Sequence, residues 1–242
     1  MSRLFQEDRL ILATHNQGKL EEIAALLAPF DVKVVGAGSL NLPEPEETES
    51  SFVGNARIKA HAAAKATGSP ALADDSGIEI AALNGAPGVY TADWAETPKG
   101  RDFKMAMEKA HFELEKINAP APRIAQFCCT LVLAWPDGTD AVFEGIMPGQ
   151  VIWPMRGDQG HGYDPIFQPD GYNVTFAEMD RWEKAHGEMA LLFAMDAHAT
   201  VIELWFEDLI EAEQHGVVSL RLAEAFAVLT KVLNKTVDIS SL

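Results

Sequence analysis

The chain has 242 residues, of which 48% are hydrophobic and 23% are charged, and it is long enough for one large core or two lobes around a cleft. Its formal net charge of −17 at pH 7 repels nucleic-acid backbones, so a polyanionic small molecule would need local cations, backbone amides or a metal to bind. Neither secretion nor a membrane span is expected, because the N-terminus lacks an apolar region with a cleavage site and Asp196, His198 and Glu203 interrupt the most apolar stretch, residues 189–206.

The first elements in chain order indicate a strand, a polar turn and a helix. Residues 9–13 (RLILA) form a short apolar run typical of a buried strand, and residues 14–19 follow as a glycine-containing turn. Apolar residues recur at helical spacing over 20–27, with acidic residues in the favourable first turn. A second strand is predicted at 31–35.

The middle of the chain continues the alternation. An Ala-rich helix is predicted at 51–67, and a short strand at 70–73 is predicted to end in an Asp-rich turn. A helix at 103–117 precedes two strands, 123–135 and 140–144, that flank a Pro-Asp-Gly turn. Strands alternating with helices predict a mixed α/β fold, and the absence of linkers or repeats predicts a single domain over residues 1–242.

The C-terminal part differs from the rest. Residues 188–218 carry apolar side chains at helical spacing with acidic residues between them, which predicts an amphipathic helix packed on the core or on a second subunit. The last helix is predicted at 219–233.

Cys128 and Cys129 are the two cysteines of the chain and are adjacent in the sequence. In a strand their side chains would point to opposite faces, so a disulfide between them is not expected, and they lack metal-ligand spacing. A chain with free thiols suits the reducing cytoplasm.

One segment that could bind phosphate joins the first strand to the first helix. A helix N-terminus offers free backbone N–H groups and a positive dipole end, and Lys19 could add a positive charge. The alternative is an ordinary turn built on Asn16 and Gly18, because the pattern matches neither a Walker loop nor GxGxxG. The segment reads Thr14-His15-Asn16-Gln17-Gly18-Lys19.

A second candidate is the acidic run Asp74-Asp75 with Ser76 behind it. Paired carboxylates can hold Mg²⁺, a hard cation that prefers oxygen ligands, and one carboxylate can take a proton from an attacking water. Glu46 and Glu47 could complete such a metal site. The alternatives are an Asp-rich turn and a solvated acidic loop.

A third candidate is the run GHGYDPIF at 160–167. Its glycines allow a flat ligand to approach the backbone closely, and the rings of His161 and Tyr163 can stack on a base. The equally frequent alternative is a turn with a buried tyrosine.

Taken together and in this order, these segments resemble the inosine/xanthosine triphosphate pyrophosphatase family. The resemblance covers nearly the whole chain except residues 188–218, which look like an insertion. The matching runs are ATHNQGKLEEI, EETESSFVGNARIKA, ALADDSGIEIAALNGAPGVYTADW, RIAQFCCTLVL, GHGYDPIF, TFAEMDRWEK and SLRLAEAFAVL.

The resemblance implies an elongated mixed-sheet α/β fold with two lobes around a central cleft, a homodimer, and Mg²⁺ as the cofactor. It implies Asp75 as the general base, with Asp74 and Lys19 in the catalytic set, and Glu47 and Asp75 as metal-associated acids. The implied substrate-binding residues are Thr14, His15, Asn16, Gln17, Gly18, Lys19, Asn55, Lys59, Ser76, His161, Gly162, Tyr163, Asp164, Lys184 and Arg221.

Asn55 and Lys59 lie four residues apart and therefore share one face of the predicted Ala-rich helix. The resemblance implies that this face borders the phosphate site. The equally weighted alternative is structural, with the two side chains tying the helix to the acidic run.

The sequence departs from the family at the base pocket. His161 stands where relatives have a stacking Phe, Asp93 where bacterial relatives commonly carry Arg, and Leu220 where a base-reading His is expected. The implied reaction is Mg²⁺-dependent hydrolysis of deaminated purine nucleoside triphosphates to the monophosphate and pyrophosphate. The alternatives are a pyrophosphatase with a shifted base preference and a non-catalytic nucleotide-binding or interaction protein.

Overall fold

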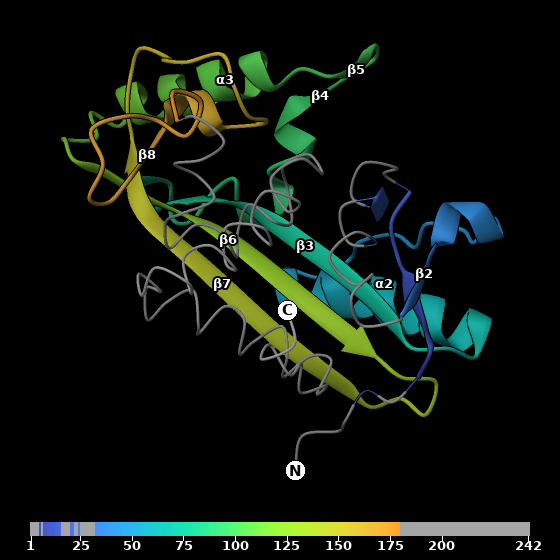
Figure 1. Ribbon diagram of the computed structural model, residues 1–242. Helices are drawn as coiled ribbons and strands as arrows, with labels where there is room; N and C mark the ends of the chain where they lie inside the picture. The colour runs from blue at the N-terminus through green and yellow to red at the C-terminus, as the bar shows by residue number, and fades with distance from the viewer. Residues whose placement is uncertain (1–4, 6, 16–19, 22–23, 25–31, 180–242) are drawn as a thin grey trace, which may run out of the picture.

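The computed structural model describes residues 5, 7–15, 20–21, 24 and 32–179, and they form a mixed α/β structure around a six-stranded sheet (Figure 1). The predicted fold class is confirmed. The strand order in this sheet is β2-β1-β3-β6-β7-β8. The strands are β1 (Arg9–Leu12), β2 (Lys33–Gly36), β3 (Ala71–Ile80), β6 (Arg123–Ala134), β7 (Asp140–Val151) and β8 (Phe167–Pro169).

Two α-helices and several short 3-10 turns complete the described elements. Helix α2 (Phe52–Thr67) and helix α3 (Phe103–Lys116) match their predicted positions within a residue. A small two-stranded sheet pairs β4 (Glu96–Thr97) with β5 (Gly100–Arg101). The 3-10 turns are η2 (Ala37–Leu40), η3 (Ala81–Leu83), η4 (Gly88–Tyr90), η5 (Asp93–Ala95) and η6 (Asp164–Ile166).

The prediction that a strand ends at residue 73 is wrong. Strand β3 continues through the Asp-Asp-Ser-Gly run to Ile80, because its whole length pairs antiparallel with β6, including Asp74 with Leu131 and Asp75 with Thr130. The acidic run is therefore extended strand and not a turn. Asp, Ser and Gly have low strand propensity, and the pairing with β6 overrides it.

The strand predicted at 140–144 is also too short. Strand β7 extends to Val151, paired with β6 along its full length and with β8 at its end. Its second half contains Pro148 and Gly149, which weaken the strand signal in the sequence. Gly149 is required there, since a Cβ atom would lie 2.4 Å from the Gln168 carbonyl oxygen.

The long strands β3, β6 and β7 run from one end of the molecule to the other and join two regions (Figure 1). At one end α3 and β8 enclose a core that includes Ile78, Leu114 and Phe167. At the other end β1, β2 and α2 lie together, with Leu12 and Leu133 packed on one face of the sheet. This arrangement agrees with the predicted elongated, two-lobed shape.

Helix α2 lies close against the sheet at the second end because the face that it buries is made of alanines. Ala56, Ala60, Ala63 and Ala64 pack on Ile11, Ala73 and Val132 of the sheet. The helix begins where the Ser51 hydroxyl accepts a hydrogen bond from the Gly54 N–H at 3.1 Å. It ends at Gly68, whose φ of 64° closes the last turn.

The remaining sequence predictions concern the two cysteines, the first helix, the C-terminal elements and the absence of a membrane span. Cys128 and Cys129 are both buried and free, as expected for neighbours on opposite faces of a strand. Leu20, Glu21 and Ala24 are helical, in line with the helix predicted at 20–27, and its other residues lie outside the described ones. The elements predicted at 188–218 and 219–233 also lie outside the described residues. Within the described residues no helix is both long and apolar enough to cross a membrane.

Candidate active site around Asp75

Strand β1 ends before strand β3 reaches the acidic run, so β1 does not pair with Asp74 or Asp75. Strand β1 pairs with β3 at Ile11–Ala71 and Leu12–Leu72, and the Ala13 N–H donates to the Leu72 carbonyl at 2.8 Å. Beyond this point the chain leaves the sheet as the segment that begins at Thr14, while β3 continues into Asp74 and Asp75. In open α/β sheets ligands bind outside the carboxyl ends of strands, which is the position of the acidic run relative to β1.

Asp75 lies against helix α2 in a buried polar cluster. Its side chain is 8% exposed and that of Asn55 is 2% exposed. The Asn55 amide oxygen accepts a hydrogen bond from the Glu49 N–H at 3.0 Å, and Asn55 also hydrogen-bonds Asp75. One turn along α2, Lys59 Nζ contacts Glu47 Oε1 at 2.5 Å. The structure thus brings these four side chains together. Asn55 links helix α2 to the acidic run, which is the structural role that the sequence left open for it.

The Asp75 carboxyl group has an unusual electrostatic environment. Burial raises its pKa to about 7, the nearby Lys59 ammonium opposes the rise, and the charges of Glu47 and Asp74 add to it. Its Oδ2 atom is buried and has no hydrogen-bond partner among the described residues. A carboxyl group of this pKa is half ionised near neutral pH and can exchange a proton there.

Asp74 and Ser76 point to the opposite face of β3 from Asp75, because side chains alternate along a strand. The two aspartates therefore do not form one side-by-side pair, although the charge of Asp74 still acts on Asp75. The Ser76 hydroxyl is buried and has no hydrogen-bond partner among the described residues. Each of these unpartnered buried atoms, one on either face of β3, is a polar group that a ligand or water can complete.

These residues could supply some, but not all, of the ligands of a divalent cation. In the described part of the chain no three His, Cys, Asp or Glu side chains converge as a ready-made metal cage. Mg²⁺ needs no such cage, because it keeps several waters and is commonly held by one or two carboxylates together with substrate phosphates. The orphaned Asp75 Oδ2, close to the Glu47 carboxylate, offers that kind of donor set.

The loop that contains Gly88 and Thr91 packs closely on strand β3 at Gly77. A Cβ atom at Gly77 would lie 2.5 Å from both the Gly88 carbonyl oxygen and Thr91 Oγ1. Thr91 Oγ1 accepts a hydrogen bond from the Ile78 N–H at 3.0 Å and donates to the Gly88 carbonyl at 2.6 Å. The loop after β3 is thus fixed against the face of the strand that also carries the Asp75 side chain.

The segment predicted to bind the base forms a tight turn in which the rings differ in exposure. The Asp164 carboxylate accepts a hydrogen bond from the His161 N–H at 2.8 Å, which holds the turn. Tyr163 is 1% exposed, its hydroxyl lies 3.5 Å from the Thr91 carbonyl, and burial raises the pKa of its phenol. Tyr163 therefore matches the buried-tyrosine alternative, and the exposed ring of the turn is that of His161.

Sequence reasoning missed Phe103. Its ring centroid lies 4.8 Å from that of His161, with the ring planes at 68°. As the first apolar residue of helix α3, Phe103 matched an ordinary core position, and only the fold brings it to the turn at 161–164. Asp93, the other departure near this region, lies exposed in η5.

The segment after β1 is only partly described. The His15 ring nitrogen Nε2 lies 3.0 Å from the Leu42 carbonyl, and Nδ1 lies 4.0 Å from the Glu44 carboxylate, so His15 packs along residues 42–45. Thr14 begins the segment, where its N–H contacts the Leu12 carbonyl at 2.8 Å. The remaining predicted site residues lie outside the described ones: Asn16, Gln17, Gly18, Lys19, Lys184 and Arg221.

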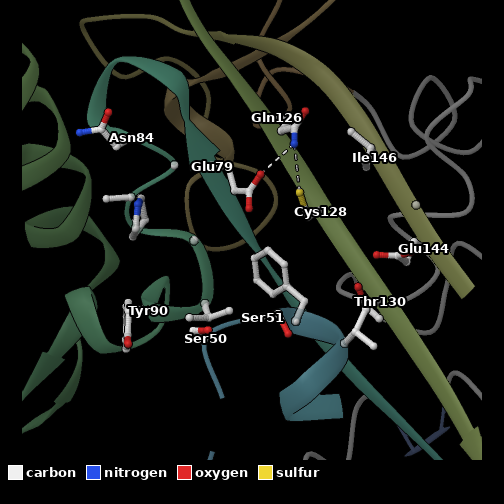
Figure 2. Close-up of a pocket in the computed structure, with 18 residues that line it drawn as sticks. Ser50, Ser51, Glu79, Asn84, Tyr90, Gln126, Cys128, Thr130, Glu144 and Ile146 are labelled. Carbon is white, nitrogen blue, oxygen red and sulfur yellow. Dashed lines mark hydrogen bonds between the residues drawn. The ribbon is translucent and has the colours of Figure 1, made fainter. Parts of the chain in front are cut away.

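A pocket of about 520 Å³ opens beyond the N-terminus of helix α2 and reaches Thr130, the residue of β6 that pairs with Asp75 (Figure 2). The Glu79 carboxylate accepts a hydrogen bond from Gln126 at 2.8 Å, beside Cys128, whose thiol pKa burial raises to about 12. Glu144 adds a second carboxylate, and the described lining includes no Lys, Arg or His. The carboxylates of this pocket repel a triphosphate unless a cation neutralises them.

This chain is similar to named proteins and to solved structures. The chain is 72% identical over 184 residues to a dITP/XTP pyrophosphatase of Ruegeria pomeroyi, a match that covers 76% of this chain and 90% of the relative. It is 50% identical over 206 residues to a dITP/XTP pyrophosphatase of Agrobacterium fabrum, covering 84% and 96% of the two chains. The HAM1 protein structure from Coxiella burnetii superposes with a TM-score of 0.69 at 36% identity and covers 84% of this chain and 99% of that one.

The model of the Ham1 family matches residues 10–189. This range contains every described residue of the Asp75 cluster and of the turn at 161–164, and it ends at the start of the segment predicted as an insertion. By its sequence, its sheet and these relatives, the chain belongs to the Ham1 family.

Proposed function

We propose that this protein hydrolyses deaminated purine nucleoside triphosphates, such as ITP, dITP and XTP, to the nucleoside monophosphate and pyrophosphate. The observation that carries the proposal is the buried Asp75 carboxyl group, with an unpartnered oxygen and a pKa of about 7, next to Lys59 and Glu47. The relatives named dITP/XTP pyrophosphatases support the substrate class.

Asp75 acts as the general base. Its ionised carboxylate takes a proton from a water molecule while the water oxygen bonds to the α-phosphorus, and the bond from that phosphorus to the bridging oxygen of the β-phosphate breaks. Pyrophosphate leaves, and the proton stays on Asp75 until solvent removes it. With its raised pKa, Asp75 is a stronger base than an ordinary carboxylate and is still partly ionised at neutral pH.

The phosphates are held by cations. Lys59, released in part from its ion pair with Glu47, neutralises charge on the polyphosphate, and the resemblance assigns Lys19 the same task. Asp75 and Glu47 would hold Mg²⁺, which when bound supplies charge neutralisation for the phosphates. Asn55 keeps Asp75 aligned through its amide group.

The base is recognised at the turn 161–164, where His161 replaces the larger aromatic ring expected there. Imidazole still stacks on a purine, with less contact area. Donors aimed at a 6-oxo group would reject adenine, since its 6-amino group would leave them unpaired. Lys184 and Arg221 are assigned to this pocket by the resemblance alone.

We further propose that the protein is a cytoplasmic homodimer that binds neither nucleic acid nor membranes. The buried free thiols of Cys128 and Cys129 suit a reducing compartment, and the net charge of −17 disfavours nucleic acid. Light scattering on the purified chain at micromolar concentration measures the assembly directly; a monomer mass there would contradict the dimer.

The test of the activity is pyrophosphate release from ITP, XTP, dITP, GTP, ATP and dUTP, with Mg²⁺ and with a chelator. We expect turnover of the first three with Mg²⁺ and loss of turnover with the chelator. Binding of ITP without turnover of any nucleotide would favour the non-catalytic alternative. Equal rates on ITP and GTP would leave the hydrolysis in place and point to a shifted base preference.

A further inference from the structure

We propose that Phe103 is a positioning residue of the base site, where it forms an aromatic support for His161. This inference deepens the proposed function and rests on it, since it assumes that the base binds at the turn 161–164. Phe103 lies on a different element from the turn, and neither the motifs nor the family resemblance assigns it a role.

The turn wraps around the Phe103 ring. The rings of Phe103 and His161 meet edge to face, with centroids 4.8 Å apart, and the Tyr163 ring lies 6.2 Å away at 75°. Gly162, between them, has a φ of 65°, and the position of a Cβ atom there would be 3.9 Å from Phe103 Cδ1 and Cε1. Three consecutive residues of the turn therefore face one ring.

The backbone at Phe103 is held on both sides, so the ring is a fixed support. Asp102 caps helix α3, since its carboxylate accepts a hydrogen bond from the Met105 N–H at 3.0 Å. The Asp102 N–H in turn donates to the Ala95 carbonyl at 2.7 Å. Phe103 is the first residue of this anchored helix.

The support matters because His161 is exposed. An exposed imidazole that lacked a neighbouring ring would sample several rotamers, and a stacked base would have to immobilise it. The edge-to-face contact with Phe103 restricts the imidazole before the base arrives. It also places additional aromatic surface at the site, where imidazole alone offers less than a phenyl ring.

The experiment compares Phe103→Leu with Phe112→Leu, a matched control at an exposed position (63%) on the same helix. Binding of ITP is measured by equilibrium titration in an Asp75→Asn background, and KM and kcat are measured in the otherwise unchanged enzyme. An aromatic contact is worth a factor of roughly 2–10 in affinity. We expect Phe103→Leu to weaken ITP binding and raise KM by that factor with kcat nearly unchanged, and Phe103→Tyr to restore both.

Proton NMR gives a readout that does not depend on the nucleotide. The His161 ring protons, assigned by comparison with His161→Gln, should lose a ring-current shift in Phe103→Leu and keep it in Phe112→Leu. An unchanged His161 spectrum, or equal changes in KM for both leucine variants, would overturn the role of Phe103. Altered ITP binding without turnover in the wild type would keep the role and reject the proposed hydrolysis, whereas no binding of ITP at all would reject both.

Discussion

At the scale of single residues, opposing effects meet at Asp75. Desolvation favours the neutral acid, while the Lys59 ammonium and the Asn55 amide favour the carboxylate. Desolvation prevails because Lys59 is already engaged by Glu47 at 2.5 Å, which divides its charge between two acids. The outcome is a buried carboxyl group whose pKa lies near neutral pH and whose Oδ2 atom has no hydrogen-bond partner among the described residues.

Asp75→Asn should lower kcat by roughly 10²–10⁴-fold, because an amide cannot accept the proton of the attacking water. The fold should persist, since an amide oxygen can still accept the hydrogen bond from Asn55. Steady-state pyrophosphate release measures the rate, and circular dichroism measures the fold. The control is Asp170→Asn, which changes an exposed aspartate directly after β8 and should retain full activity. Near-normal activity of Asp75→Asn would mean that another group is the base.

The raised pKa of Asp75 also predicts how stability depends on pH in the metal-free protein. The folded state binds a proton up to about pH 7, whereas an unfolded aspartate loses it near 3.8, so the folded state holds more protons between these values. Stability from this group is therefore present at pH 4 and lost as pH rises to 7, by up to about 4 kcal/mol.

Urea unfolding of the wild type and Asp75→Asn, in a chelator at pH 4 to 8, measures this difference. The variant should match the wild type near pH 4 and be the more stable of the two above pH 7. A constant difference across that range would show that Asp75 keeps an ordinary pKa. Adding Mg²⁺ should reduce the difference, because a bound cation favours the carboxylate.

At the scale of elements, the site forms where α2 and β3 come together. The alanine face of α2 lets the helix approach β3 closely, and the same helix presents Asn55 and Lys59 to Asp75. On the same face of β3, the close crossing at Gly77 fixes the loop that ends at Thr91. Any shift of β3 relative to either neighbour changes the position of Asp75 or Ser76.

Gly77→Ala should therefore destabilise the protein by about 1–3 kcal/mol and lower activity as well. The new methyl group would lie 2.5 Å from a backbone carbonyl, so the loop must move. Thermal unfolding and pyrophosphate release are the measurements. Gly38→Ala is the control for stability, since its Cβ would be 3.5 Å from the His15 ring, an ordinary contact. Equal melting temperatures for the two variants would contradict the crossing as described.

At the scale of the whole molecule, the long strands couple the two end regions. Leu114 belongs to the core beneath α3 and Leu133 to the core at the other end, and β6 and β7 pass through both regions. Strands that are shared in this way make it costly to unfold one end alone, because the pairing of β3, β6 and β7 would be broken in the middle.

Leu114→Ala and Leu133→Ala should each lower the midpoint of one common unfolding transition. Each removes a fully buried side chain, at a cost of about 2–5 kcal/mol, which corresponds to roughly 4–20 °C in a domain of this size. Differential scanning calorimetry distinguishes the outcomes. Two resolved transitions, with each substitution moving a different one, would show that the ends unfold independently.

The sequence alone determined the local features of this protein. The helices predicted at 51–67, from an Ala-rich run, and at 103–117 match α2 and α3 within a residue, and the shared face of Asn55 and Lys59 followed from their spacing. The ordered motifs were enough to identify the family. These features depend on neighbours within a few residues along the chain, which is why a single sequence contains them.

Only the tertiary structure decided the features that depend on distant partners. The acidic run is strand because β6 pairs with it, and Asp75 has its pKa because α2 covers it. Tyr163 is buried and His161 exposed because one of them packs into the core beneath α3, where Phe103 meets the turn. Pairing, burial and ring contacts of this kind join residues far apart in the chain, so the free energy that decides them is absent from any local pattern.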